Sequence, residues 1–229
     1  GGKPHAKDGM GEEKMIERKQ YRGCLRAGWK PEEFMEAVKK AASAAQAAVE
    51  EGKLLTASLY RYQDMCFLYY EAPQENAAPE DFLSALTPFL EEWPEENGKT
   101  PWAYMYHIFH HSVPGETEDW IRERKEGKTR IGRIAFLFPD KVFSYARWHQ
   151  AIVEEGLLKG DKYQCIALHE NILFSYFEEP RYNVNIRREP DRESREIEGW
   201  MKADPESHFD RAKAGGENFR IIEQLFTAG

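Results

Sequence analysis

The chain has 229 residues, of which 41% are hydrophobic and 31% charged, a balance typical of a folded protein with a sizeable core. Its 32 Lys and Arg residues stand against 40 Asp and Glu residues, and the net charge of −8 argues against nucleic acid as a partner. The longest apolar runs, such as Ile134–Phe138, are far shorter than the roughly 20 residues that cross a bilayer. We therefore expect no membrane partner and a cytoplasmic location. The three cysteines lack paired or metal-like spacing, which predicts reduced thiols.

Residues 1–20 lack apolar periodicity and are predicted to be a disordered tail. The first half then predicts, in order, a strand over Tyr21–Trp29, a helix over Glu32–Glu51, a hairpin over Leu55–Pro73, a helix over Pro79–Trp93 and a strand over Trp102–His110. The second half predicts a strand over Arg130–Phe138, a helix that ends at Gly156, a hairpin over Lys162–Pro180, a helix over Arg192–Ala203 and a strand over Phe219–Phe226.

The two predicted hairpins are copies of one another. Without a gap, Phe67 falls on Phe174, Tyr69 on Tyr176, Glu71 on Glu178 and Pro73 on Pro180, always 107 residues apart. The polar turns Gln63-Asp64 and Glu170-Asn171 also coincide. The order of elements around each hairpin is shared, so the chain reads as βαββαβ twice.

This order predicts an α+β fold of two ferredoxin-like βαββαβ repeats. A ferredoxin-like sheet has helices on one face only, so we expect the two sheets to pack face to face as a pseudo-dimeric α+β barrel. The predicted parts are the tail at 1–20, repeat 1 at 21–112, a linker at 113–129 and repeat 2 at 130–229. Because fusion already covers the free sheet faces, a monomer is favoured over a homodimer.

Three features between or within the repeats could serve a ligand. Thr56, Ser58 and Tyr60 share one strand face, which would make the inner face of the barrel partly polar and able to line a pocket. In the linker, Trp120 is predicted to dock as an anchor. The segment Pro180–Asp191 is either a solvated loop or a lid, with three arginines that could meet an anionic or hydroxyl-rich ligand: Arg181, Arg187 and Arg188.

Repeat 2 alone carries a polar aromatic pair on its first helix. Tyr145 and His149 are four residues apart and share a helix face. Alignment of Pro31 with Pro139 places Ala37 opposite Tyr145 and Ala41 opposite His149. A working site is therefore expected in repeat 2, although each of these side chains is also a common core residue.

The strand before Pro139, the Tyr145-x-x-x-His149 motif, the hairpin and a second helix with Trp200 together resemble the L-rhamnose mutarotase family. The likeness covers about residues 130–229. Members of that family are dimeric α+β barrels that interconvert sugar anomers. The resemblance implies His149 as the catalytic acid and base, with Tyr145, Tyr163 and Trp200 as substrate contacts.

Anomer exchange needs a proton delivered to the ring oxygen and another removed from the anomeric hydroxyl, which one histidine near neutral pKa can do. Arg133 and Arg187 are expected as outer contacts to the sugar hydroxyls. This predicts a sugar isomerase that needs no cofactor and no metal, with a sugar-like small molecule as its partner.

A second histidine cluster lies in the last strand of repeat 1. Strand alternation places His107 and His111 on one face and His110 on the other. His107 and His111 would lie about 13 Å apart along the strand, too far to share one metal.

Two alternatives to the isomerase stay open. Fused ferredoxin-like repeats also resemble haem-binding barrels of the chlorite-dismutase type, in which His149 or His208 could be an axial ligand. The other alternative is a non-catalytic module that binds a small molecule.

Overall fold

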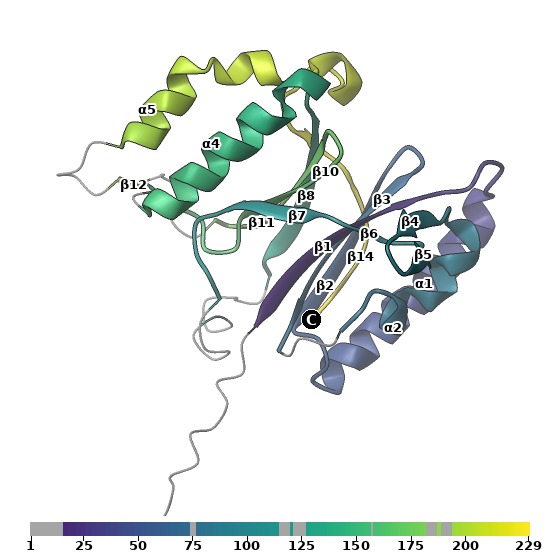
Figure 1. Cartoon of the computed structure of the whole chain (residues 1–229). Helices are drawn as coiled ribbons and strands as arrows, with labels where there is room; N and C mark the ends of the chain where they lie inside the picture. Colours follow the sequence, from purple (N-terminus) through teal and green to yellow (C-terminus); the bar gives the residue numbers. More distant parts are fainter. Residues whose placement is uncertain are drawn as a thin grey trace, which may run out of the picture.

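Two five-stranded antiparallel sheets form the centre of the molecule (Figure 1). The computed structural model describes residues 16–73, 77–114, 120, 127–156, 158–181, 187–188 and 194–229. The first sheet has the strand order β14-β2-β3-β1-β6, and the second has the order β13-β8-β11-β10-β7. Helices cover the outer face of each sheet, so the layers run helix, sheet, sheet, helix. The fold is α+β with two ferredoxin-like units packed sheet to sheet, as predicted.

The strands are β1 (Glu17–Cys24), β2 (Thr56–Tyr62), β3 (Met65–Ala72), β4 (Trp93–Glu95), β5 (Gly98–Thr100), β6 (Ala103–Tyr104), β7 (Tyr106–His110), β8 (Thr129–Phe136), β9 (Leu158–Lys159), β10 (Cys165–His169), β11 (Ile172–Glu179), β12 (Arg187–Arg188), β13 (Arg220–Ile221) and β14 (Glu223–Ala228). The α-helices are α1 (Pro31–Glu50), α2 (Glu80–Leu83), α4 (Val142–Glu155) and α5 (Arg195–Lys202), and the 3-10 helices are η1 (Ser84–Phe89), η2 (Pro139–Lys141), η3 (Pro205–His208) and η4 (Arg211–Ala214). No helix among the residues that the structure describes is long and apolar enough to cross a membrane.

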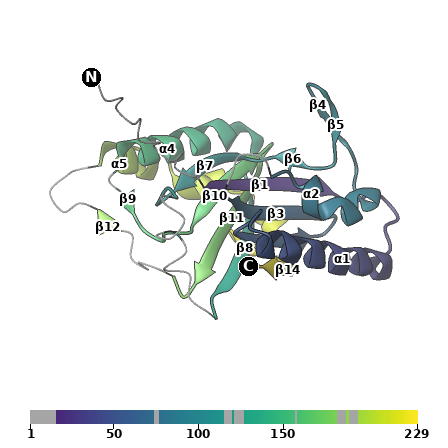
Figure 2. The same ribbon diagram turned by 90° about the horizontal axis from the view of Figure 1, so that it is seen from below.

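The fourth strand of each repeat is divided between the two sheets. In repeat 1, β6 pairs with β1 in the first sheet, and after Met105 the chain continues as β7, which pairs with β10 in the second. In repeat 2, β13 pairs with β8, and after Ile222 the chain continues as β14 along β2 of the first sheet. Figure 2 shows β14 beside α1 and β7 beside α4. Each sheet therefore contains strands of both repeats. The boundaries of the repeats at residues 112 and 130 stay a prediction.

Three buried clusters fill the spaces between the layers. One lies between the first sheet and α1 and α2, and includes Phe34, Tyr70 and Trp102. A second lies between the two sheets and includes Phe67 and Phe174. The third lies between the second sheet and α4 and α5. Burial of apolar surface in these clusters is the main stabilising contribution to the barrel.

Local sequence explains where the helices begin and end. Pro31 occupies the first turn of α1, where its missing N–H removes no intrahelical hydrogen bond. Helix α4 ends at Gly156, which adopts φ 71°, a left-handed conformation that suits glycine. Helix α5 begins after Ser194, whose hydroxyl accepts a hydrogen bond from the Ile197 N–H at 3.0 Å.

Several predicted elements differ from the structure. Strand β1 begins at Glu17, four residues before Tyr21, because Ile16 is already buried between the sheets. Residues 1–15 of the predicted tail lie outside the described residues. The predicted helix over 79–93 is only the short α2 followed by η1, since Pro88 lacks the N–H that an α-helix would use.

The inner face of the barrel is filled by side chains and does not line the pocket described below. Thr56, Ser58 and Tyr60 are fully buried, and Tyr60 packs against Phe174 with ring centroids 5.7 Å apart. The three cysteines are free thiols, two of them buried. The predicted anchor Trp120 is confirmed: it is 1% exposed, and its Nε1–H donates to Glu71 Oε2 at 3.0 Å.

Candidate functional site

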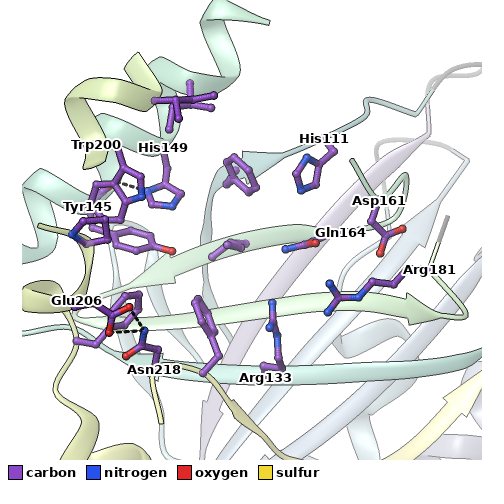
Figure 3. A pocket seen from close by; sticks show the side chains of 17 residues that line it. His111, Arg133, Tyr145, His149, Asp161, Gln164, Arg181, Trp200, Glu206 and Asn218 are labelled. Carbon is purple, nitrogen blue, oxygen red and sulfur yellow. Dashed lines mark hydrogen bonds between the residues drawn. The ribbon is translucent and has the colours of Figure 1, made fainter. Parts of the chain in front are cut away.

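A cavity of about 510 Å³ lies between helices α4 and α5 and the outer face of the second sheet. Figure 3 shows two groups of side chains around it. The aromatic end is formed by Phe109, Tyr145, His149, Trp200 and Phe209. The charged end is formed by His111, Arg133, Asp161, Gln164 and Arg181. The cavity thus combines a large apolar wall with a few polar groups, as small-molecule sites usually do.

The aromatic end depends on the spacing along α4. Tyr145 and His149 lie one turn apart and stack, with ring centroids 3.8 Å apart and planes 14° from parallel. Trp200 of α5 meets both rings edge-on, at 5.4 Å from Tyr145 and 4.8 Å from His149. Tyr145 is 2% exposed and His149 is 9% exposed. Phe109 of β7 also meets the imidazole edge-on at 5.4 Å, so packing on three sides holds the ring in one orientation.

The close contact between the two helices sets the position of Trp200. Gly199 faces Trp148 of α4, and a Cβ at this position would lie 2.3 Å from the indole ring. Only glycine allows this approach without a shift of one helix or of the Trp148 side chain. The sequence Gly199-Trp200 therefore brings α5 against α4 and places the indole against His149.

The protonation of His149 follows from its contacts. Its Nδ1 lies 2.8 Å from the backbone oxygen of Tyr145, so Nδ1 carries the hydrogen and donates it. Burial lowers the pKa of His149 to about 4, and this outweighs the opposing effect of the backbone hydrogen bond. At neutral pH the ring is therefore uncharged, and its Nε2 is a hydrogen-bond acceptor with no partner among the described residues.

Tyr145 adds a donor to the same end. Burial raises its pKa, so the hydroxyl stays protonated, and it points into the cavity in Figure 3. His149 Nε2 and the Tyr145 hydroxyl are thus an acceptor and a donor at the aromatic end, where Glu206 and Asn218 also line the cavity.

Two arginines dominate the charged end. Arg133 of β8 donates from Nη2 to Ser175 Oγ at 3.1 Å, and its guanidinium lies 4.8 Å from the Phe177 ring. Arg181, which follows β11, lies over the same ring at 4.2 Å. Within the described part of the chain, neither guanidinium forms an ion pair with a carboxylate. Burial, with the charge of Arg181, lowers the pKa of Arg133 to about 10, which leaves it cationic at neutral pH.

Asp161 and His111 complete the charged end. Asp161 is 3% exposed, and its Oδ1 accepts a weak hydrogen bond from the Tyr163 N–H at 3.4 Å. Burial raises the pKa of this carboxyl group, an effect that the nearby Arg181 opposes. Burial also lowers the pKa of His111 to about 4. The Asp161 Oδ2 and His111 Nδ1 atoms are buried and have no partner among the described residues.

Four of the six predicted site residues line this cavity: Tyr145, His149, Trp200 and Arg133. Tyr163 does not, because it is fully buried between the sheets, where its ring meets Trp120 edge-on at 4.9 Å and its hydroxyl donates to the Trp120 carbonyl. Arg187 lies in β12, and its side chain, like that of Arg188, lies outside the described residues. Their roles as contacts stay predictions.

Asp161 and Gln164 line the cavity but are not among the residues predicted from the sequence, and His111 was not predicted to belong to this site. No spacing pattern joins these three residues, because they come from separate strands and turns. The predicted placement of His107 and His111 on one strand face, with His110 on the other, is wrong because β7 contains a β-bulge. The register of β7 on β10 shifts between Ile166 and Ala167, which brings His107 and His110 together with ring nitrogens 2.9 Å apart and leaves His111 to the cavity. Across the described residues, no group of three or more potential ligands could hold a metal ion.

Repeat 1 has no equivalent aromatic pair. Ala37 and Ala41, which correspond to Tyr145 and His149, are 7% and 0% exposed in the core under α1. Tyr70 and Trp102 occupy that core. The asymmetry expected from the sequence is present in the structure.

No protein-family model matches the chain, and no curated protein matches it. Solved structures similar to it include a putative monooxygenase from Fusobacterium nucleatum subsp. nucleatum, with 11% identity, 94% of both chains covered and a TM-score of 0.41. A putative monooxygenase from Lactobacillus acidophilus has 6% identity over 93% of this chain and 96% of that one, with a TM-score of 0.38. An anthrone oxidase-like protein has 11% identity over 94% and 93%, with a TM-score of 0.34.

These names correct the expectation of a sugar isomerase. The three structures are named for monooxygenase or oxidase activity, and none is named for a mutarotase, so the predicted anomer interconversion is wrong. The resemblance to the rhamnose mutarotase family depended on a short helix motif, and the structure places Tyr163 away from the cavity. None of the three names refers to haem, and the haem-binding alternative stays a prediction.

Proposed function

We propose that the cavity binds a small aromatic molecule that carries a hydroxyl group on its ring. The observation that carries this proposal is the neutral His149, whose Nδ1 is bound by the Tyr145 carbonyl and whose ring lies in an aromatic wall. A planar apolar ring suits contacts with Trp200, Phe109 and Phe209. A phenolic O–H would donate to Nε2, the acceptor that the described residues leave without a partner.

The low pKa of His149 defines what it does to such a ligand. Its protonated form is a much stronger acid than a phenol, so in the resting complex the phenol keeps its proton and shares it in a hydrogen bond. Negative charge that develops on the bound oxygen would raise the pKa of the imidazole and favour transfer of the proton to Nε2. His149 is therefore a hydrogen-bond acceptor for the bound ligand. It acts as a base only in a reaction that builds up negative charge on the ligand oxygen.

A pair of matched ligands tests the proposal by titration calorimetry. 2-Naphthol has the O–H donor, and 2-methoxynaphthalene has the same ring system without it. We expect 2-naphthol to bind about 3- to 10-fold more tightly, the effect of one net hydrogen bond. His149→Phe keeps an aromatic ring on α4 and should remove the difference, whereas His169→Gln, in the distant β10–β11 hairpin, should not.

Equal affinity of the two ligands for the wild-type protein, or a preference that survives in His149→Phe, would overturn the proposal. Dioxygen consumption in the presence of bound 2-naphthol tells whether the site also turns the ligand over.

A further inference from the structure

The charged end of the cavity holds buried polar groups that lack partners in the described part of the chain. These are the Nε of Arg133, the Oδ2 of Asp161 and the Nδ1 of His111. All three residues line the same cavity. A buried polar atom without a hydrogen bond destabilises the folded protein, and each such atom in a native structure needs an explanation. Three of the eight such atoms in the described residues lie at this end of one cavity, and a ligand bound there is the explanation that covers all three together.

The two guanidinium groups identify the charge of that ligand. Arg133 and Arg181 both extend into the cavity in Figure 3, and both lie over the Phe177 ring. The positive charge of Arg181 lowers the pKa of Arg133, which means that the two cations repel each other. An anion between them would remove this repulsion and would accept hydrogen bonds from both.

Asp161 restricts the kind of anion. Its buried carboxyl group lines the same end, and burial raises the pKa of this group. A doubly charged phosphate would face this group at close range, whereas a carboxylate carries one charge and matches the planar guanidinium geometry. The Asp161 Oδ2 also has no hydrogen-bond donor among the described residues. An O–H or N–H group next to the carboxylate of the ligand would provide one.

We infer that the ligand of this cavity is an aromatic carboxylic acid whose carboxylate binds Arg133 and Arg181 and whose neighbouring O–H or N–H donates to Asp161. This inference rests on the proposed function, because the ring of the same ligand occupies the aromatic end beside His149. It adds the substrate class: a hydroxylated aromatic ring joined to a 2-hydroxy or 2-amino carboxylate.

Three ligands with one skeleton test the inference by calorimetry at pH 7 and low ionic strength. They are 3-(4-hydroxyphenyl)propanamide, 3-(4-hydroxyphenyl)propionate and 3-(4-hydroxyphenyl)lactate. The propionate should bind at least about tenfold more tightly than the amide, since hydrogen bonds to charged groups are the stronger ones. The lactate should bind a further threefold or so more tightly because its hydroxyl reaches Asp161.

Variants locate each effect. Arg133→Gln and Arg181→Gln should each reduce the preference for the propionate over the amide to threefold or less, while Arg147→Gln, an exposed arginine on α4, should leave it unchanged. Asp161→Ala should remove the gain of the lactate over the propionate. Thermal melts of each variant establish that it is folded.

The outcomes separate this inference from the proposed function. If the amide and the propionate bind equally and both depend on His149, the aromatic site stands and the carboxylate inference is overturned. If none of the three binds while 2-naphthol does, the carboxylate inference alone is overturned, and if 2-naphthol does not bind either, both fail. Tighter binding of phenyl phosphate than of the propionate would overturn the assignment of the anion as a carboxylate.

Discussion

The rings of Tyr69 and Tyr176 stack across the interface between the two sheets, with centroids 3.5 Å apart and planes 7° from parallel. They are equivalent residues of the two repeats. Each hydroxyl donates to the glutamate two residues further along its strand, Tyr69 to Glu71 at 2.8 Å and Tyr176 to Glu178 at 3.2 Å. Both glutamates are fully buried. The duplicated Tyr-x-Glu unit therefore meets its own copy in the centre of the barrel.

Loss of one hydroxyl in this unit should destabilise the protein although the stack remains. Tyr69→Phe removes a donor to the buried Glu71 carboxylate, and we expect the free energy of unfolding to fall by about 1–3 kcal/mol. The measurement is urea denaturation followed by circular dichroism. Tyr106→Phe, at a side chain that is 71% exposed, is the control and should change stability by less than about 0.5 kcal/mol. Equal effects of the two changes would contradict this interpretation.

The ion pair between Arg130 and Glu178 should contribute far more to the stability of the folded protein than the pair between Arg61 and Glu223. The first pair is 3.3 Å apart with side chains 8% and 0% exposed, and the second is 2.9 Å apart with side chains 27% and 54% exposed. Arg130→Met removes a buried cation that pairs with a buried carboxylate and should cost about 3–5 kcal/mol. Arg61→Met should cost about 1 kcal/mol or less. Chemical denaturation of both variants compares them, and a smaller loss for Arg130→Met would refute the prediction.

Acidification should destabilise the protein partly through His149. Its pKa is lowered to about 4 in the folded state, so the unfolded chain takes up this proton first as the pH falls below about 6.5. The contribution of His149 is present above pH 6.5, is lost as the pH falls to 4, and amounts to roughly 3 kcal/mol. In urea titrations between pH 7 and pH 4, His149→Phe should show a shallower decline than the wild type. The decline should not vanish, because burial also lowers the pKa of His111 to about 4. Parallel curves for the two proteins would disprove the assignment.

Gly199 should control ligand binding without touching the ligand. An alanine methyl group would collide with the Trp148 side chain, so Trp148 or α5 must move, and movement of α5 carries Trp200 away from His149. We expect Gly199→Ala to weaken binding of 2-naphthol by about tenfold or more, the effect of losing an aromatic contact of roughly 1.5 kcal/mol. Lys202→Ala, an exposed change on the same helix, is the control. Unchanged affinity in Gly199→Ala would show that the helix contact does not position the indole.

The repeat and the order of its elements could be predicted because both depend on short stretches of the sequence. The hairpin turns are one example: Gln63 and Glu170 both adopt positive φ at equivalent positions. The exchange of β7 and β14 could not be predicted, since the partner of an edge strand depends on how the sheets meet. The aromatic end followed from the helical spacing of Tyr145 and His149. The charged end did so only in part: Arg133 and Arg181 were candidate contacts, but no sequence pattern joins them with Asp161, because the three residues come together only in the folded structure.

The stoichiometry of binding tests the central claim, a single aromatic site in repeat 2, most directly. Titration calorimetry with 2-naphthol should give one site per chain. Ile152→Trp, which places a large side chain in the cavity wall, should abolish binding while circular dichroism shows the fold intact. Two sites per chain, or undiminished binding in folded Ile152→Trp, would contradict the assignment of the cavity between α4, α5 and the second sheet as the ligand site.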